Sequence, residues 1–217
     1  NAIFMTFGDI SAEKQQTKIH ELALEGLDSI GVSEIAVSEE KRFTVPQNKI
    51  FEYPIDDDNS ANKTHIVLAW LLGKNTDLKM LLKCNLLSDF LLDTSASPLR
   101  FALEKCEFAT SVSPLSGLED DHMEMNFVCG VEGSNPESAD QIESLVLEVL
   151  EKISEDGVDE KQLESVLYQL ELSQREIGGD GWPYGLQIIF SCMSAAIHRG
   201  DPIGFLDIEQ ALQELRE

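Results

Sequence analysis

The stretch HMEMNFVCGVEGSNPESADQIESLVLEVLEKISEDG, residues 122–157, contains the two patterns that decide the fold. In its first part, apolar residues alternate with mostly polar ones, which predicts a β-strand over residues 122–131 with one buried face. The alternating apolar residues are Met123, Met125, Phe127, Cys129 and Val131. A strand with this alternation needs an apolar layer on one side only.

The second part of the same stretch has helical spacing. Asn135 and Pro136 fit the cap and first-turn positions of a helix, and Gly157 is a typical terminator. Apolar residues at this spacing form a stripe that should face the core: Ile142, Leu145, Val146, Val149, Leu150 and Ile153. A half-buried strand followed by an amphipathic helix indicates an α+β fold.

Upstream of this stretch, the sequence predicts a β-hairpin. Residues 50–55 have the pattern of a strand, and residues 56–60 have the composition of a turn. Residues 64–72 are so apolar that we expect a strand buried on both faces.

Two helices and a strand should follow the hairpin. Asn75 or Thr76 should cap the first helix, Pro98 begins a second that runs to about Lys105, and residues 107–113 should form a strand. The first helix has an apolar stripe that consists of Leu78, Leu82, Leu86 and Phe90, widened by Leu81.

The two ends of the chain differ from this middle part. Near the N-terminus we expect a strand over residues 3–7 and a helix from Ser11 to about Ile30. Toward the C-terminus we expect only helices. Asp159 should cap one that stops at Gly178-Gly179, and two more should span residues 185–198 and 203–216.

These patterns predict an α+β fold with a mostly antiparallel sheet and helices packed on one face, followed by an all-helical extension. We divide the chain into residues 1–31, the last strand and helix of another unit, a connector over 32–48, an α+β unit over 49–158 and a helical region over 159–217. Because the chain begins without a methionine, a basic leader or a cleavage site, we expect it to be a segment of a longer protein.

Composition excludes several classes of function. The chain has 217 residues, of which 16 are Lys or Arg and 40 are Asp or Glu, so its formal net charge is −24. Such an excess of acid predicts no binding to nucleic acid or to anionic membranes and favours neutral or basic partners. The longest apolar run, residues 66–72, is much shorter than the ~20 residues that span a bilayer.

Four cysteines are widely spaced, at positions 84, 106, 129 and 192, and form no Cys-x-x-Cys pair. We therefore expect buried free thiols rather than a zinc site or a disulfide framework. This pattern favours a soluble protein of the cytoplasm or of an organelle matrix.

No motif for catalysis or metal binding occurs in the sequence. None of the four histidines has a second ligand at metal-binding spacing, and no Gly-x-Ser-x-Gly elbow is present. Asp56, Asp58 and Ser60 resemble the start of a calcium loop, but Ala61 and Val67 stand where that loop needs Gly and Glu. The Gly-rich residues 178–181 are best interpreted as a turn between two helices. We predict no catalytic, cofactor-binding or metal-binding residue in this chain.

The helix over residues 136–156 carries acidic residues between its apolar positions, among them Glu143, Glu148, Glu151 and Glu155. Such interleaving is typical of a solvated outer face. The alternative is an acidic wall that lines a chamber and attracts basic peptides.

Several segments together resemble the pitrilysin or insulinase-type zinc metallopeptidases, in particular the presequence-protease (falcilysin-like) branch. Residues 1–9, NAIFMTFGD, are similar to the strand before the last helix of that family's catalytic unit. Residues 97–105, SPLRFALEK, with ATSVS at 109–113, resemble a helix and strand of the family, and residues 127–133 and 155–160 match its order of elements. The most specific likeness is to the family's helical linker, in QLELSQRE at 169–176, GD at 179–180, PYGL at 183–186 and HRGDP at 198–202.

The resemblance implies a clamshell of four homologous α+β units that encloses short unstructured, presequence-like peptides and cleaves them with zinc. It places this chain at the end of the first unit, the whole second unit and the start of the linker. The family's His-x-x-Glu-His zinc motif is absent from these residues. We therefore expect a noncatalytic segment, inactive alone, whose partners are the rest of the parent polypeptide and basic or unstructured peptides.

A second hypothesis is a stand-alone binding or scaffold protein, similar to the family's catalytically silent subunits. The two hypotheses differ in what precedes residue 1 in the gene. The sequence does not decide which residues would contact a substrate.

Overall fold

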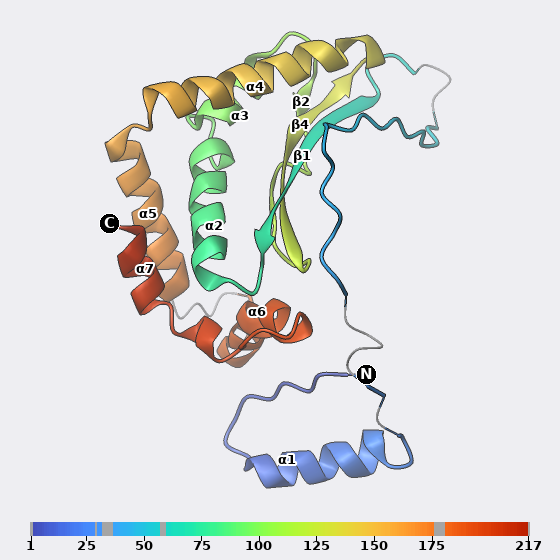
Figure 1. Cartoon of the computed structure of the whole chain (residues 1–217), viewed down its shortest axis with the longest axis vertical. Coiled ribbons are helices and arrows are strands. Elements are labelled where there is room, and N and C mark those ends of the chain that lie inside the picture. The colour runs from blue at the N-terminus through green and yellow to red at the C-terminus, as the bar shows by residue number, and fades with distance from the viewer. Residues whose placement is uncertain (1, 29, 32–36, 57–59, 176–180, 217) are drawn as a thin grey trace.

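A four-stranded antiparallel sheet forms the centre of the computed structural model, which describes residues 2–28, 30–31, 37–56, 60–175 and 181–216 (Figure 1). Its strands are β1 (Thr64–Lys74), β2 (Ser111–Val112), β3 (Gly117–Glu119) and β4 (Glu124–Ser134). The strand β4 pairs with all three others, in the order β1-β4-β2 with β3 also on β4. The predicted antiparallel sheet is confirmed, and the strand predicted over residues 122–131 is its central member.

The long pairing between β1 and β4 depends on a glycine. Ile66 lies opposite Val131, Leu68 opposite Cys129 and Trp70 opposite Phe127. A Cβ atom on Gly130 would lie 2.1 Å from the carbonyl oxygen of Ile66. The two backbones approach too closely here for any other residue.

Three helices cover one face of the sheet: α2 (Leu78–Leu92), α3 (Pro98–Lys105) and α4 (Ala139–Asp156) (Figure 1). Their apolar sides pack against the inward side chains of β1 and β4. The buried members of this core are Phe90, Leu91, Leu92, Leu99, Leu103, Phe127, Cys129, Val131, Ile142 and Val146. The expectation of helices on one face of the sheet is confirmed.

The helix that decides the fold begins and ends close to its predicted bounds. A short 3-10 turn at Pro136–Ser138 precedes α4, and Asn135 is its N-cap. The backbone of Gly157 has a φ of 79°, which ends α4. Of the predicted stripe, Ile142 and Val146 are fully buried.

The hairpin predicted between residues 50–55 and 64–72 is wrong. Residues 50–55 form no strand and are exposed, and β1 pairs with β4 instead. The centre of the predicted turn, residues 57–59, lies outside the described residues. The strands β1 and β4 both have 11 residues with matching apolar alternation, so their pairing sets the inward apolar side chains of both strands side by side against the helices. The segment over residues 50–55 has no such complement.

Burial of β1 on both faces is also wrong. Its exposure alternates along the strand, and the outward Val67 is 43% exposed. Helices cover only the inward side chains of β1. The apolar run predicted a helix layer on both faces of this strand, but the described residues supply a helix layer on one face.

Three local predictions change in detail. The cap of α2 is Asp77, whose carboxylate accepts a hydrogen bond from the Met80 amide at 3.0 Å, rather than Asn75 or Thr76. The strand predicted over residues 107–113 shrinks to β2, and β3 was missed. Asn75, which was expected to cap α2, is fully buried, and its Nδ2 donates a hydrogen bond to the Asp120 carbonyl oxygen.

The C-terminal part is helical, as predicted. Asp159 caps α5 (Glu160–Arg175) through the Gln162 amide, and α6 spans Tyr184–Ile197. The single helix predicted over residues 203–216 is wrong, because a 3-10 turn at Gly204–Leu206 and α7 (Glu209–Leu215) take its place.

Helices α5 and α7 belong to the same packed body as the sheet. Both contact α2, and the side chain of Leu212 in α7 is buried. Ion pairs join α5 to α7 at Arg175–Glu209 and Glu171–Arg216. These contacts attach the helical region to the back of the sheet's helical layer.

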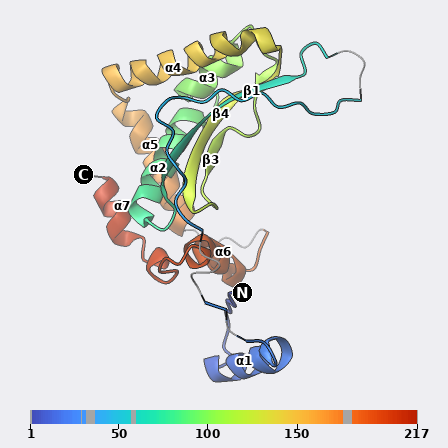
Figure 2. The ribbon, with the colours of Figure 1, turned by 45° about the vertical axis from the view of Figure 1, so that its right-hand side comes forward.

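The N-terminal part differs most from its prediction. Residues 3–7 are extended but pair with no strand among the described residues, so the predicted strand is wrong at this point. Helix α1 spans Ala12–Ile19 and continues as a π-helical turn at His20–Leu24, so it ends before the predicted Ile30. In Figures 1 and 2, α1 lies beyond α6, away from the sheet.

Candidate functional site

The histidines lie apart and have ordinary polar neighbours. His65 Nδ1 lies 3.8 Å from a carboxylate oxygen of Glu132, and His198 Nε2 lies 3.0 Å from the Asp121 carbonyl oxygen. His122 is next to Asp121, and His20 is exposed on the π-helical turn. In the described ranges, no group of three or more His, Cys, Asp or Glu side chains is arranged to hold a metal ion.

The calcium-loop resemblance at residues 56–60 and the Gly-rich residues 178–181 lie only partly within the described residues. Asp58, one of the three residues that resemble a calcium loop, lies outside the described residues, whereas Asp56 and Ser60 are described and exposed. Most of the Gly-rich turn, residues 178–180, also lies outside them. Both interpretations therefore stay predictions.

The cysteines are free thiols, as expected. Cys129 and Cys192 are buried, whereas Cys84 and Cys106 are half-buried. Burial raises the pKa of the Cys129 thiol to about 12. A thiol of this kind is protonated at neutral pH and is not a nucleophile.

The acidic residues of α4 lie on the helical side of the molecule. Glu143, Glu148, Glu151 and Glu155 are all exposed, and the opposite side of α4 packs on α3 and the sheet. They form the solvated outer face that their spacing predicts. They do not converge on the uncovered side of the sheet.

That uncovered side of the sheet is the candidate surface. We call it the open face, and it consists of Val67, Ala69 and Leu71 of β1 and Asn126 and Val128 of β4. These side chains alternate with the inward core residues and have no helix over them among the described residues (Figure 1). An apolar sheet face left uncovered is a typical surface for contact with another chain or peptide.

A polar hollow lies at one end of the open face. It has a volume of ≈ 250 Å³ and is lined by Tyr53, Asn62, Lys63, His65, Thr110, Ser111, Glu132 and Gly133. The Ser111 hydroxyl donates to the Glu132 carboxylate at 2.9 Å. Hydroxyl, imidazole and carboxylate groups therefore border the apolar centre of the sheet at this end.

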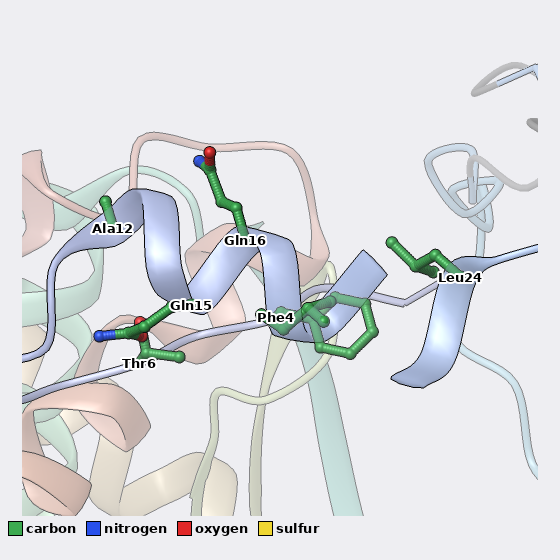
Figure 3. Close-up of a pocket in the computed structure, with 7 residues that line it drawn as sticks. Phe4, Thr6, Ala12, Gln15, Gln16 and Leu24 are labelled. Carbon is green, nitrogen blue, oxygen red and sulfur yellow. The ribbon is translucent and has the colours of Figure 1, made fainter. Parts of the chain in front are cut away.

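A second hollow lies in the N-terminal part. It has a volume of ≈ 340 Å³ between the extended residues and the helical turns, and Phe4 and Leu24 lie at one end of it (Figure 3). The remaining residues that line it are Thr6, Ala12, Gln15, Gln16 and Ile19. This hollow is a gap between two loosely packed elements.

One buried charge was not predicted from the sequence. The side chain of Glu124, the first residue of β4, is only 7% exposed and holds the guanidinium of Arg42 at 2.5 Å. Glu124 and Arg42 are separated by 82 residues. Local spacing carries no signal for such a pair, whose only trace in the sequence is an acidic residue at the start of an alternating strand.

The family assignment follows from the match of the whole α+β region. The family profile described as the peptidase M16 inactive domain matches residues 1–170. The chain belongs to this family. The members most similar in sequence include presequence proteases. The mitochondrial presequence protease of Xenopus tropicalis is 26% identical over 219 residues, and presequence protease 1 of Arabidopsis thaliana is 30% identical over 179 residues.

These relatives are much longer than the chain. The match covers 100% of this chain but 21% of the Xenopus protein, and 82% of this chain but 16% of the Arabidopsis protein. The predicted resemblance to the presequence-protease branch of the metallopeptidases is confirmed.

Solved structures confirm the fold. The inactive peptidase domain of a candidate zinc protease from Bordetella parapertussis superposes with a TM-score of 0.54 at 17% identity, covering 69% of this chain and 78% of that one. The periplasmic protease PqqL of Escherichia coli gives a TM-score of 0.51 at 14% identity and covers 95% of this chain and 22% of that one. The chain therefore shares the fold of these solved structures.

The residues described here do not fit a zinc ion, because no suitable ligand group exists among them. No helix in the described part of the chain has the length and apolar character that a membrane crossing requires.

Proposed function

We propose that this M16 inactive domain forms a noncatalytic wall of a zinc metalloendopeptidase that degrades short unstructured peptides inside a closed chamber. The observation that carries the proposal is the open face, one side of the sheet that no described helix covers. The chain matches about a fifth of the length of a protein named presequence protease, so the domain is one part of a larger molecule in that relative. In this proposal the zinc ligands and the catalytic carboxylate belong to the rest of the longer protein.

The proposed substrate surface is the open face rather than the acidic helix. An extended peptide can lie along the apolar side chains of Val67 and Val128, and the hollow around His65 and Glu132 offers polar contacts at one end. The net charge of −24 favours the approach of basic peptides by long-range attraction. The carboxylates of α4 contribute to this field and to solubility from the outside.

The division of the chain is part of the same proposal. Residues 1–31 would complete the preceding catalytic unit, residues 49–158 would be the noncatalytic unit, and residues 159–217 would begin the helical linker. We propose a soluble protein of the cytoplasm or an organelle matrix, in keeping with relatives whose names are mitochondrial or chloroplastic.

The first experiment is to read the gene upstream of the codon for Asn1. An intact His-x-x-Glu-His motif with a later Glu supports the proposal. A start codon at this point, or a motif that lacks its His or Glu, contradicts it and favours the stand-alone binding or scaffold protein.

The second experiment tests the open face in the full-length protein. Val67→Arg places a positive charge on the open face, and Leu147→Arg is the matched control on α4, because the two side chains are 43% and 45% exposed. We expect Val67→Arg to lower kcat/KM for a quenched fluorescent basic peptide by about tenfold and Leu147→Arg to leave it near the wild-type value. Equal effects of the two variants would exclude the open face as the substrate surface.

A further inference from the structure

Two ion pairs and a hydrogen bond attach the connector over residues 37–48 to one end of the sheet. Glu124 Oε1 accepts from the Arg42 guanidinium at 2.5 Å, and Glu124 Oε2 accepts from the Glu40 amide at 2.7 Å. One residue earlier in the connector, Glu39 pairs with Lys74 at 2.5 Å. Both oxygens of a buried carboxylate are thus used by the connector alone.

The sheet presents these two charges side by side. Lys74 is the last residue of β1, and Glu124, the first residue of β4, is its partner in the strand register. The connector supplies the opposite sign to each, with Glu39 for Lys74 and Arg42 for Glu124. Arg42 also donates to the Leu72 carbonyl oxygen at 3.1 Å, so its guanidinium bridges both strands.

The rest of the connector makes few contacts of this kind. The side chains of Phe43 and Val45 in the connector, and of Ile50 and Phe51 just after it, are 62–91% exposed. The next attachment is at Tyr53, whose hydroxyl donates to the Lys63 carbonyl oxygen and whose ring lies edge-on to His65. The charged contact is therefore a local anchor on an otherwise loosely held segment, which runs beside β1 on the side away from α2 (Figure 1).

We propose that Glu124 is a latch that fixes the connector at residues 39–42 and thereby sets the position of the N-terminal part relative to the sheet. This inference concerns the chain itself and does not depend on the proposed peptidase function. The charges shift one another in the expected sense, since Lys74 lowers the pKa of Glu39 and Glu39 raises the pKa of Lys74.

The latch acts by shortening a tether. From Leu24, the end of the π-helical turn, to Tyr53, the next attachment after the latch, the chain is 53 − 24 = 29 residues long. With the latch closed, the tether ends at Glu40 and is 40 − 24 = 16 residues long. Closure of the latch therefore shortens the stretch of chain between the π-helical turn and its first attachment to the sheet.

The extended residues before α1 have a defined seat. The ring of Phe7 packs against Gly185 and lies edge-on to Tyr184, at a centroid distance of 5.9 Å. Met5 packs on the cluster formed by Cys192, Ala195 and Phe205. The shorter tether favours this docking of the extended residues on α6.

Trypsin provides a direct test, because its specificity pocket must take up the side chain of the residue that it cuts after. Arg42 is a trypsin site inside the latch, and Lys49 is a site one residue beyond the connector and outside the latch. We compare the two cleavage rates by mass spectrometry in Glu124→Gln, which removes the charge but keeps an acceptor oxygen, and in Glu124→Ala, which removes both. Glu132→Gln, on the same strand and bonded to Ser111 instead, is the matched control.

We expect cleavage after Arg42 to be about tenfold faster in Glu124→Gln, with cleavage after Lys49 unchanged and Glu132→Gln like the wild type. Amide exchange at Glu40 should rise further in Glu124→Ala than in Glu124→Gln. An unchanged rate after Arg42, or equal acceleration after Arg42 and Lys49, overturns the latch. Should Glu124→Ala fail to fold, Glu124→Gln alone decides the question.

Discussion

Two regions of the described chain, a sheet half over residues 64–156 and an N-terminal half over residues 2–56, have similarly apolar sequences but bury their apolar side chains very differently. In residues 64–156, apolar side chains form a core in which many are fully buried. In residues 2–56, large apolar side chains are exposed. Among them are Ile3, Phe4, Phe7, Ile10, Leu22, Leu27, Phe43, Ile50 and Phe51. The difference teaches that an apolar pattern forms a strand or a packed helix only where a complementary element is available.

The partner for the N-terminal part is absent from the described residues. Its extended residues and α1 leave a hollow between them and contact the rest of the chain mainly through Met5 and Phe7. The sheet half needs no further partner for its core, though its open face stays uncovered. Variants that weaken one half alone would test how far the two are independent.

The largest effect is expected for Gly130→Val in the sheet half. Any Cβ here would lie 2.1 Å from the Ile66 carbonyl oxygen, so β1 and β4 cannot keep their pairing. We expect the loss of cooperative unfolding, measured by circular dichroism during heating. Gly181→Ala is the control, since a Cβ there meets nothing within 4 Å, and it should unfold like the wild type.

Two replacements of a large side chain by alanine, one in each half, should reproduce the contrast in burial. Leu99→Ala removes a fully buried side chain from the core and should lower the free energy of unfolding by about 2–5 kcal/mol. Ile50→Ala removes a side chain that is 91% exposed and should change it by less than about 0.5 kcal/mol. Urea denaturation measures both, and a similar loss of stability in the two variants would show that the segment around Ile50 is packed in solution.

Alkaline pH should weaken the sheet half through Cys129. Its pKa is about 12 in the folded state against 9.0 for the ordinary thiol, so the unfolded chain loses this proton first. Stability from this group is complete below pH 9 and falls by about 1.4 kcal/mol per unit as pH rises toward 12. Urea denaturation at pH 8 and pH 10 should show a smaller difference for Cys129→Ala than for the wild type. Rapid alkylation of Cys129 in the folded protein at pH 8 would contradict the prediction.

The smallest of these effects is expected for Asp77→Ala at the start of α2. The carboxylate of Asp77 satisfies the Met80 amide, and its loss should cost about 1 kcal/mol. Asp77→Asn keeps an acceptor oxygen and should retain most of the stability. An equal loss in both variants, measured by thermal unfolding, would point to the charge of Asp77 rather than to its hydrogen bond.

Much of the fold could be predicted from local patterns. The alternation in β4, the bounds of α3 and the stop at Gly157 each depend on neighbours within a few residues, and each was found where it was expected. A metal-binding motif has fixed spacing and would be recognisable in the sequence, and none occurs there. The open face could not be predicted in this way, because the exposure of Val67 depends on which distant elements pack above it.

The sequence by itself determined the α+β class, the positions of most helices and the likeness to the M16 family, because these follow from periodicity, caps and short motifs. Only the tertiary structure decided that β1 pairs with β4 rather than with residues 50–55, that one sheet face stays open and that Glu124 holds Arg42. A local period of two or 3.6 residues tells which side of an element is apolar. It carries no information on which distant segment covers that side, since pairing is a competition among all segments of the chain.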